Sequence, residues 1–348
     1  MKWLIYGANG YSGELIARES KKRGLTPVLA GRSAERLRPL AQELGFEERV
    51  FGLEHAQEIT ANLAGINLVL HCAGPFSATS APMIEACLAK GAHYLDITGE
   101  IDVFEHAHAK NEEATKAGVV LCPGVGFDVI PTDCIAAVLK KVLPDAERLS
   151  LGFDSRSPMS PGTAKTTVEG LPQGGRVRQD GRIVSVPLAH HVRRIDFGDG
   201  EKWAMSIPWG DVSTAYYTTG IGNIEVFVPA SPRLIAGAKR ANSFLWLLRL
   251  KPIQAFLKYR AGRRTGPSQA RRDAGATFVW GEAVNGKGDK KTARIKTENG
   301  YTVTVNGALA VVDYVLSHDV KGGTYTPATL VGADLLTGLP GSGPLCVT

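Results

Sequence analysis

The first 148 residues alternate short apolar runs with longer amphipathic stretches, and this alternation constrains the fold more than any other feature of the sequence. Each apolar run has the length of a buried strand, and a stretch with helical periodicity follows it. The expected strands are Lys2–Tyr6, Thr26–Ala30, Arg49–Leu53, Asn67–Cys72, Ala92–Ile97 and Val119–Cys122. The expected helices are residues 12–23, 34–44, 56–63, 79–90, 101–117 and 130–143. Strands joined by helical crossovers form a parallel, doubly wound α/β sheet.

Beyond Pro144 the pattern changes to β-branched, partly alternating segments, which are typical of antiparallel strands. The expected strands are Leu149–Asp154, Arg182–Val186, Arg193–Phe197, Ile224–Val228, Thr277–Gly286, Lys291–Thr297 and Tyr301–Val305. Tight turns are expected at Asp180-Gly181, Asp199-Gly200 and Asn299-Gly300, and the last two should connect hairpins. A helical region is expected over about 232–261, and Thr326-Pro327 should begin another helix that ends near Leu336.

We therefore expect three parts. Residues 1–148 form a Rossmann domain, and residues 149–322 form a mixed α+β domain with a largely antiparallel sheet. Residues 323–348 form a C-terminal helix and tail that pack back on the first domain.

Composition excludes several classes of protein. The five cysteines include no Cys-x-x-Cys pair, which disfavours disulfide frameworks and thiolate zinc sites and favours a reducing compartment. His106 and His108 lie two apart on an expected helix and so face different ways. The apolar run before Gly7 is too short for a signal peptide, and no apolar run reaches the roughly 18 residues of a membrane span. We expect a cytoplasmic protein without a metal site, in contact with a membrane at most through its surface.

A glycine-rich turn joins the first strand to the first helix. It reads Gly7-Ala8-Asn9-Gly10-Tyr11-Ser12-Gly13. A pyrophosphate binds to backbone N–H groups at a helix N-terminus, so side chains must be absent where the backbone meets the ligand. The spacing and its place after a strand predict a dinucleotide site formed by Gly7, Asn9, Gly10, Tyr11, Ser12 and Gly13.

The end of the second strand distinguishes NADP from NAD. An NAD site usually places Asp or Glu there, to bind the ribose 2′-hydroxyl. This sequence has Gly31-Arg32-Ser33 instead. A guanidinium pairs with a 2′-phosphate, whereas a carboxylate would repel it. Arg32 and Ser33 therefore predict NADP, and Ser33 can also cap the helix that follows.

Three further motifs follow later strands of the first domain: His71-Cys72-Ala73-Gly74-Pro75-Phe76, the run from His93 to Glu100, and the run from Pro123 to Asp133. With the glycine turn, they resemble the saccharopine dehydrogenase-like family, especially its trans-acting enoyl reductase branch. The resemblance implies an NADP-binding Rossmann domain, a second domain whose sheet covers the nicotinamide, and hydride transfer. It also implies that the loop of Cys72, Ala73, Gly74, Pro75 and Phe76 lies beside the nicotinamide ribose, with Gly99 and Gly124 at the same edge.

The residue that exchanges the proton stays open. Reduction of an enoyl or imine bond needs one acid near the reacting carbon. The candidates are Tyr94, Glu100, Asp128 and Lys165, with Asp96, His190, His191, Tyr216 and Tyr217 as further alternatives. Cys72 lies at a strand end without a partnered histidine and is better read as a small apolar residue.

Residues 231–272 contain 11 Lys or Arg and no Asp or Glu, together with aromatic residues such as Phe244 and Trp246. This composition is typical of a helix at a membrane surface. It also suits the tail of an acyl thioester, a homodimer contact, or a core helix with a solvated charged face. Nucleic-acid binding is disfavoured because no matching module is present.

The sequence therefore predicts an NADP-dependent oxidoreductase acting on a small hydrophobic molecule, such as a lipid-derived enoyl or carbonyl compound. One alternative is an amino-acid dehydrogenase of the saccharopine type, whose substrate carries several carboxylates and requires clustered Arg and Lys. Another is a protein that binds NADP as a sensor or scaffold and catalyses nothing.

Overall fold

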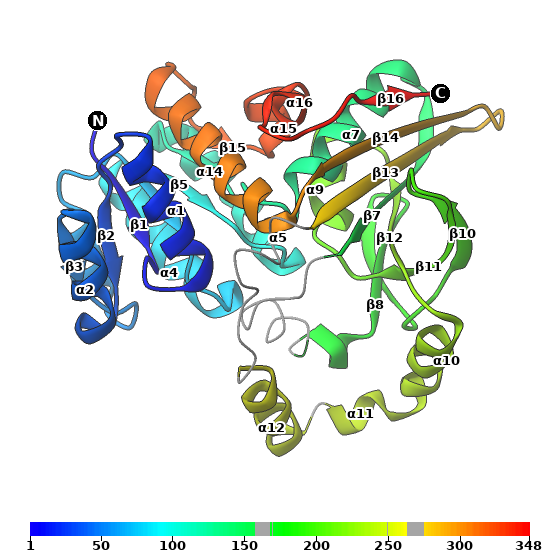
Figure 1. Cartoon of the computed structure of the whole chain (residues 1–348), viewed down its shortest axis with the longest axis horizontal. Helices are drawn as coiled ribbons and strands as arrows, with labels where there is room; N and C mark the ends of the chain where they lie inside the picture. The colour runs from blue at the N-terminus through cyan, green and yellow to red at the C-terminus, as the bar shows by residue number, and fades with distance from the viewer. Residues whose placement is uncertain (157–167, 169, 249, 263–274) are drawn as a thin grey trace. The chain divides into compact units, whose positions relative to one another are not determined.

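The computed structural model describes residues 1–156, 168, 170–248, 250–262 and 275–348 (Figure 1). The chain divides into two units. Unit 1 is Met1–Ile130 with Tyr301–Leu335, and unit 2 is Pro131–Gly300 with Leu336–Thr348. These boundaries differ from the three predicted ranges, 1–148, 149–322 and 323–348, because the chain returns to unit 1 after Gly300.

Unit 1 contains a parallel sheet of seven strands, which confirms the predicted Rossmann architecture. Its order is β15 (Gly323–Thr324), β6 (Val120–Cys122), β5 (His93–Asp96), β4 (Leu68–His71), β1 (Trp3–Tyr6), β2 (Val28–Gly31) and β3 (Glu48–Val50). Its helices include α1 (Tyr11–Lys22), α2 (Ala34–Leu44), α3 (Ala56–Asn62), α4 (Phe76–Lys90), α5 (Ile101–Ala109), α6 (Asn111–Ala117), α14 (Gly300–Ser317) and α15 (Pro327–Leu330). The strand β15 comes from the predicted C-terminal segment and pairs in parallel with β6.

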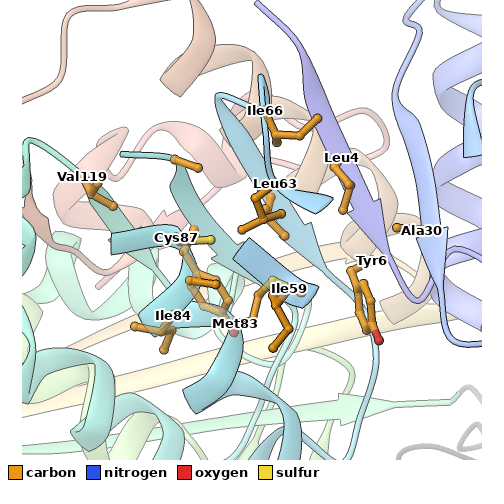
Figure 2. Close-up of a cluster of buried hydrophobic side chains, with 14 of the residues drawn as sticks. Leu4, Tyr6, Ala30, Ile59, Leu63, Ile66, Met83, Ile84, Cys87 and Val119 are labelled. Carbon is orange, nitrogen blue, oxygen red and sulfur yellow. The ribbon is translucent and has the colours of Figure 1, made fainter. Parts of the chain in front are cut away.

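Alternate residues of the central strands form one buried hydrophobic cluster of unit 1. Leu4 and Tyr6 of β1 point to the same face of the sheet, because successive side chains of a strand alternate. Ile59 of α3 and Met83 of α4 pack against that face (Figure 2). All four residues of β1, β2 and β4 are buried, which explains why these strands read as unbroken apolar runs.

Unit 2 contains the predicted mixed sheet. Its main order is β10 (Val192–Asp196), β11 (Glu201–Ile207), β12 (Asn223–Pro229), β7 (Ala146–Ser155), β13 (Ala276–Asn285), β14 (Lys290–Glu298) and β16 (Cys346–Val347). The hairpin of β8 (Gly175–Gln179) and β9 (Arg182–Val186) adds to β12. Every pair is antiparallel except β12 with β7. Its helices include α7 (Ile130–Val142), α9 (Asp211–Thr219), α10 (Pro232–Ala241), α11 (Leu245–Leu248), α12 (Lys251–Gly262) and α16 (Leu335–Gly338), with short 3₁₀ turns at Leu171–Gln173 and Asn242–Phe244.

The predicted strand Tyr301–Val305 is wrong, and so is the predicted hairpin at Asn299-Gly300. These residues lie at the start of α14, which runs for 18 residues. The run Thr302 to Val305 favours a strand locally, but the buried residues continue to Val315. Burial of this long apolar helix outweighs the weak local preference of its first turn.

Two predicted turns and one predicted helix cap are confirmed. The turn Asp180-Gly181 joins β8 to β9 with φ of +48° and +78°, and Asp199-Gly200 joins β10 to β11. Thr326 caps α15 with a reciprocal hydrogen-bond pair to Thr329, although that helix already ends at Leu330. The single helix predicted over 101–117 divides at Lys110 into α5 and α6. Within the described residues, no helix combines the length and apolar composition required to cross a bilayer.

Candidate functional site

Three loops of unit 1 meet where the strand order reverses. The strand β1 pairs with β2 on one side and with β4 on the other, all in parallel. The loops after these strands therefore lie side by side at the carboxyl edge, the place where open α/β sheets bind ligands. They contain the glycine turn, Arg32 and the loop Cys72–Phe76. The structure thus brings together the main groups of residues predicted to bind the cofactor.

Two glycines of the turn are required by the fold itself. Gly7 has φ of +81°, and a Cβ on it would lie 2.8 Å from the backbone nitrogen of Ala73. A Cβ on Gly13 would lie 2.3 Å from the carbonyl oxygen of Gly7. Both positions therefore keep the first helix and the Cys72–Phe76 loop close to β1.

Gly10 differs from these two glycines because it is exposed. A Cβ there would approach only the carbonyl oxygen of Gly7, at 3.1 Å, so the remaining space is open to a ligand. Gly10 is also the N-cap of α1, and no side chain caps the first turn, which begins with Tyr11 and Ser12. Backbone N–H groups at such a helix start are suited to bind a pyrophosphate.

The neighbours of the glycine turn are also defined. The Asn9 side chain covers Gly31, since its Oδ1 would lie 2.9 Å from a Cβ there. The Tyr11 ring meets Tyr301 of α14 edge-on, with ring centroids 5.0 Å apart. Sequence reasoning missed Tyr301 because its segment was assigned to a strand of the second domain.

Arg32 is exposed at the end of β2 and forms no ion pair with a described residue. Its charge acts on the phenol of Tyr6. Burial and the Glu54 carboxylate raise the pKa of this phenol to about 12, and the Arg32 charge acts in the opposite direction. An exposed guanidinium without a partner is available to a phosphate. Ser33 is the N-cap residue of α2, but its hydroxyl makes no capping hydrogen bond, so the predicted capping role is wrong.

His71 and Thr79 fix the loop Cys72–Phe76 through hydrogen bonds. The Thr79 hydroxyl donates to the carbonyl oxygen of Ala73 (2.6 Å), and the His71 Nε2 lies 3.0 Å from that hydroxyl. Burial lowers the pKa of His71 to about 3, so this imidazole is neutral. The peptide Gly74-Pro75 is cis, and Gly74 is exposed at the edge of the site. Burial and the nearby Asp96 raise the pKa of the Cys72 thiol, which does not favour a nucleophilic thiolate.

Glu100, a predicted proton donor, instead caps α4. Its carboxylate accepts hydrogen bonds from the backbone N–H groups of Phe76 (2.9 Å) and Ser77 (2.7 Å). A negative charge at a helix N-terminus is stabilising, and here it also fixes the end of the Cys72–Phe76 loop. The geometry favours a positioning role for Glu100.

Tyr94 is fully buried, which does not favour a role as proton donor to a substrate. Its hydroxyl donates to Asp96 Oδ2 (2.7 Å), and Asp96 Oδ1 accepts from the N–H groups of Thr98 (2.9 Å) and Gly124 (2.8 Å). Burial raises the pKa of Asp96 to about 6. Because its N–H group is bound to Asp96, Gly124 shapes the loop after β6.

Asp128 lies on the loop after β6, at the same edge of the sheet. Burial raises the pKa of its carboxyl to about 7, although the side chain stays partly accessible. Its Oδ2 would lie 2.9 Å from a Cβ on Gly99, so the glycine there leaves room for this carboxyl. A carboxyl that titrates near neutral pH is suited to acid–base chemistry. Lys165, the fourth candidate, lies outside the described residues.

The further candidates of unit 2 form two separate groups. His190 and His191 have ring centroids 4.2 Å apart, and His191 Nδ1 lies 2.6 Å from Glu225 Oε1. These three residues could together hold a metal ion, a group that the sequence did not predict because Glu225 of β12 is distant in sequence from the two histidines, which precede β10. Tyr216 stacks on the Arg178 guanidinium at 4.2 Å, an arrangement that stabilises the β8–β9 turn.

Comparison with known proteins agrees with this geometry. Residues 3–122 match the model of the saccharopine dehydrogenase NADP binding domain. The chain is similar to the trans-acting enoyl reductase of Mycobacterium tuberculosis, with 34% identity over 138 residues, 37% of this chain and 33% of that one. It is also similar to the saccharopine dehydrogenase-like oxidoreductase of Mus musculus, with 30% identity over 150 residues, 37% of this chain and 35% of that one. The matched region spans about a third of the length of these relatives.

Two solved structures resemble the chain over its whole length. Apo saccharopine dehydrogenase (L-Glu forming) from Saccharomyces cerevisiae has a TM-score of 0.67 at 10% identity, covering 100% of this chain and 99% of that one. Homospermidine synthase from Legionella pneumophila in complex with NAD has a TM-score of 0.68 at 11% identity, covering 100% and 91%. At such identities the likeness concerns the fold. The predicted family resemblance, and NADP as the cofactor of its N-terminal domain, are confirmed by the domain match.

Proposed function

We propose that this chain, which carries a saccharopine dehydrogenase NADP-binding domain over residues 3–122, is an NADP-dependent oxidoreductase acting on a hydrophobic enoyl or carbonyl compound. The observation that carries the proposal is the meeting of three loops at the strand-order reversal of unit 1. There the exposed residues Gly10, Arg32 and Gly74 lie at one sheet edge, and Arg32 forms no ion pair with the part of the chain that the structure describes.

The residues at this edge fit NADP. The space above Gly10 and the uncapped start of α1 suit the pyrophosphate, and Arg32 suits the 2′-phosphate. The Cys72–Phe76 loop, fixed by Glu100 and Thr79, supports the nicotinamide end. When bound, NADPH supplies the hydride.

Asp128 is the residue that we propose to exchange the proton. Its carboxyl titrates near pH 7, so both protonation states are populated under neutral conditions. Tyr94 and Glu100 are less suited, because the first is buried in the core and the second binds the start of α4.

The substrate class rests on one observation. The relative from Mycobacterium tuberculosis is named an enoyl reductase. This favours a hydrophobic substrate, and a saccharopine-type substrate, which carries several carboxylates, is the alternative that the experiment tests.

The test is a comparison of substrates in an assay that follows the loss of NADPH absorbance. We expect turnover with long-chain enoyl or carbonyl thioesters and none with glutamate plus an amino-acid semialdehyde. Turnover only with the amino-acid pair would identify a saccharopine-type dehydrogenase instead. Tight NADPH binding without turnover of either class would indicate a non-catalytic NADP-binding protein.

A further inference from the structure

The helices α10 to α12 of unit 2 expose an unusual number of large apolar side chains. Of the twelve large apolar residues exposed in the described part of the chain, six lie in this segment: Leu234, Phe244, Trp246, Leu250, Phe256 and Tyr259. Trp246 is 62% exposed and Tyr259 is 64% exposed. Single exposed apolar residues are ordinary, but a concentration of aromatic ones in one segment indicates an interaction surface.

The opposite side of the segment is attached to unit 2. Ile235 of α10 is buried against Ala189 and Ala230. The Asn242 side chain exchanges two hydrogen bonds with the backbone of Leu188, at 2.8 and 3.1 Å. In Figure 1, α10, α11 and α12 follow one another below the strands of unit 2, and α10 is drawn nearest to them. The segment that exposes the aromatic side chains is therefore attached to unit 2 through Ile235 and Asn242.

The charge of the segment has one sign. Arg233, Lys239, Arg240 and Arg260 are exposed and form no ion pair with any described residue. The sequence has no Asp or Glu between residues 231 and 272 that could neutralise them. Elsewhere in unit 2, by contrast, acidic residues accompany the cations, and Lys202 and Arg194 are paired with carboxylates. Among the described residues, the segment is thus a cationic surface without ion pairs, interleaved with aromatic side chains.

We propose that α10–α12 dock this protein on an anionic lipid bilayer. Cations attract the negative surface of such a membrane, and Trp, Tyr and Phe side chains insert at its headgroup level. A second copy of the chain is a poorer occupant, because two copies of this surface would bring like charges together. The proposal does not depend on the oxidoreductase function, since it uses only residues of this segment.

The binding should depend on salt in a defined way. Each cation near an anionic surface strengthens binding about fivefold, and screening removes most of this at high salt. Reversal of Lys239 and Arg240 to Glu changes the charge by four and should weaken binding by at least about 100-fold. The aromatic side chains contribute through apolar burial, which salt does not screen.

The test is co-sedimentation of the full chain with vesicles of phosphatidylcholine alone and of phosphatidylcholine mixed with phosphatidylserine, at about 0.1 M and about 1 M salt. We expect wild type to bind the anionic vesicles at the lower salt and to lose most binding at the higher. The triple variant Trp246→Ala, Lys239→Glu, Arg240→Glu should not bind.

A matched control for the charge reversal carries the same changes elsewhere in unit 2: Lys287→Glu, Lys291→Glu. Both of these residues are exposed, and the control should bind like wild type. Circular dichroism and thermal melting show whether each variant folds, and a blue shift of tryptophan fluorescence on vesicle addition tests wild type by itself.

Three results would overturn the proposal: no wild-type binding to either vesicle, equal binding to both, or equal loss in the triple variant and the control. In the first case, a changed mass of the triple variant in analytical ultracentrifugation would assign the surface to a homodimer. A raised KM for acyl substrate at unchanged mass would assign it to the substrate.

Discussion

Arg32 carries an exposed guanidinium where an NAD-binding domain would place a carboxylate. We expect wild type to bind NADPH more tightly than NADH, and Arg32→Ala to weaken NADPH binding about 10- to 150-fold. This range corresponds to the roughly 1.5–3 kcal/mol of a hydrogen bond to a charged group. Isothermal titration calorimetry of both dinucleotides measures the effect.

Glu54 provides the matched control for Arg32, because both charges act on the phenol of Tyr6. Glu54→Gln removes a negative charge near Tyr6 and leaves Arg32 in place. This variant should therefore keep the preference for NADPH or increase it. Equal affinity of wild type for NADPH and NADH would show that Arg32 does not select the cofactor.

Gly10 and Gly13 should respond differently to the same substitution. Gly10→Val places its side chain in open space at the start of α1, so the protein should fold but lose NADPH binding. Gly13→Val meets the Gly7 carbonyl oxygen at 2.3 Å and should lower the melting temperature itself. Thermal melting with and without NADPH separates the two effects. A folded Gly10→Val variant with normal NADPH affinity would mean that the glycine turn does not bind the pyrophosphate.

Asp128 should give the reduction reaction its pH dependence. An acid must be protonated to donate, and burial raises the pKa of this carboxyl to about 7. We therefore expect kcat to be constant below about pH 7 and to fall tenfold per pH unit above it. Asp128→Asn should lower kcat by about 10²- to 10⁴-fold and abolish this fall. A pH–rate profile of both proteins measures this.

Stability provides the control for that substitution. The folded pKa of Asp128 lies above the usual unfolded value of about 3.9, so the native state holds the proton more tightly. Its contribution to stability is therefore lost as the pH rises from about 4 to about 7. Above pH 7, Asp128→Asn should be at least as stable as wild type. An unchanged pH profile in a stable Asn variant would remove Asp128 from the mechanism.

At the scale of elements, α4 depends on a cap that comes from another loop. The Glu100 carboxylate binds the first two N–H groups of the helix, at Phe76 and Ser77. Glu100→Ala should lower the free energy of unfolding by about 2 kcal/mol, and Glu100→Gln by about 1 kcal/mol. Urea denaturation measures both. A larger loss of kcat than of NADPH affinity in Glu100→Gln, at unchanged stability, would indicate a catalytic role instead.

The elements that the sequence predicted well are those with a strong local signal. The strands β1, β2 and β4 of unit 1 are short apolar runs buried on both faces, and the turn Asp180-Gly181 uses residues that tolerate positive φ. The helix α9 was not predicted, because its Thr, Ser and Tyr residues have weak helix propensity. The start of α14 was predicted as a strand for the same reason, since its stability comes from burial at long range.

At the scale of the whole molecule, the sequence predicted the part of the candidate site that lies within one continuous segment of the chain. The glycine turn, Arg32 and Cys72–Phe76 all lie within the first 76 residues. The long-range contacts of the site were not predicted. Tyr301 packs on Tyr11, and the Thr304 hydroxyl accepts a hydrogen bond from the N–H of Phe127 (3.0 Å). No local pattern relates residues so distant in sequence, so the return of the chain to unit 1 could not be predicted.

This return of the chain makes α14 part of the unit that binds the cofactor, and hydrogen exchange should reveal it. NADPH at a hundred times its Kd stabilises the binding unit by about 2.7 kcal/mol. Amides of α14 that exchange through unfolding of unit 1 should therefore slow about 100-fold, together with those of β1 and β4. Those of β13 and β14 in unit 2 serve as the internal comparison and should slow less. If NADPH protects β1 and β4 but leaves α14 unchanged, the helix unfolds separately, and Tyr301 and Thr304 do not support the site.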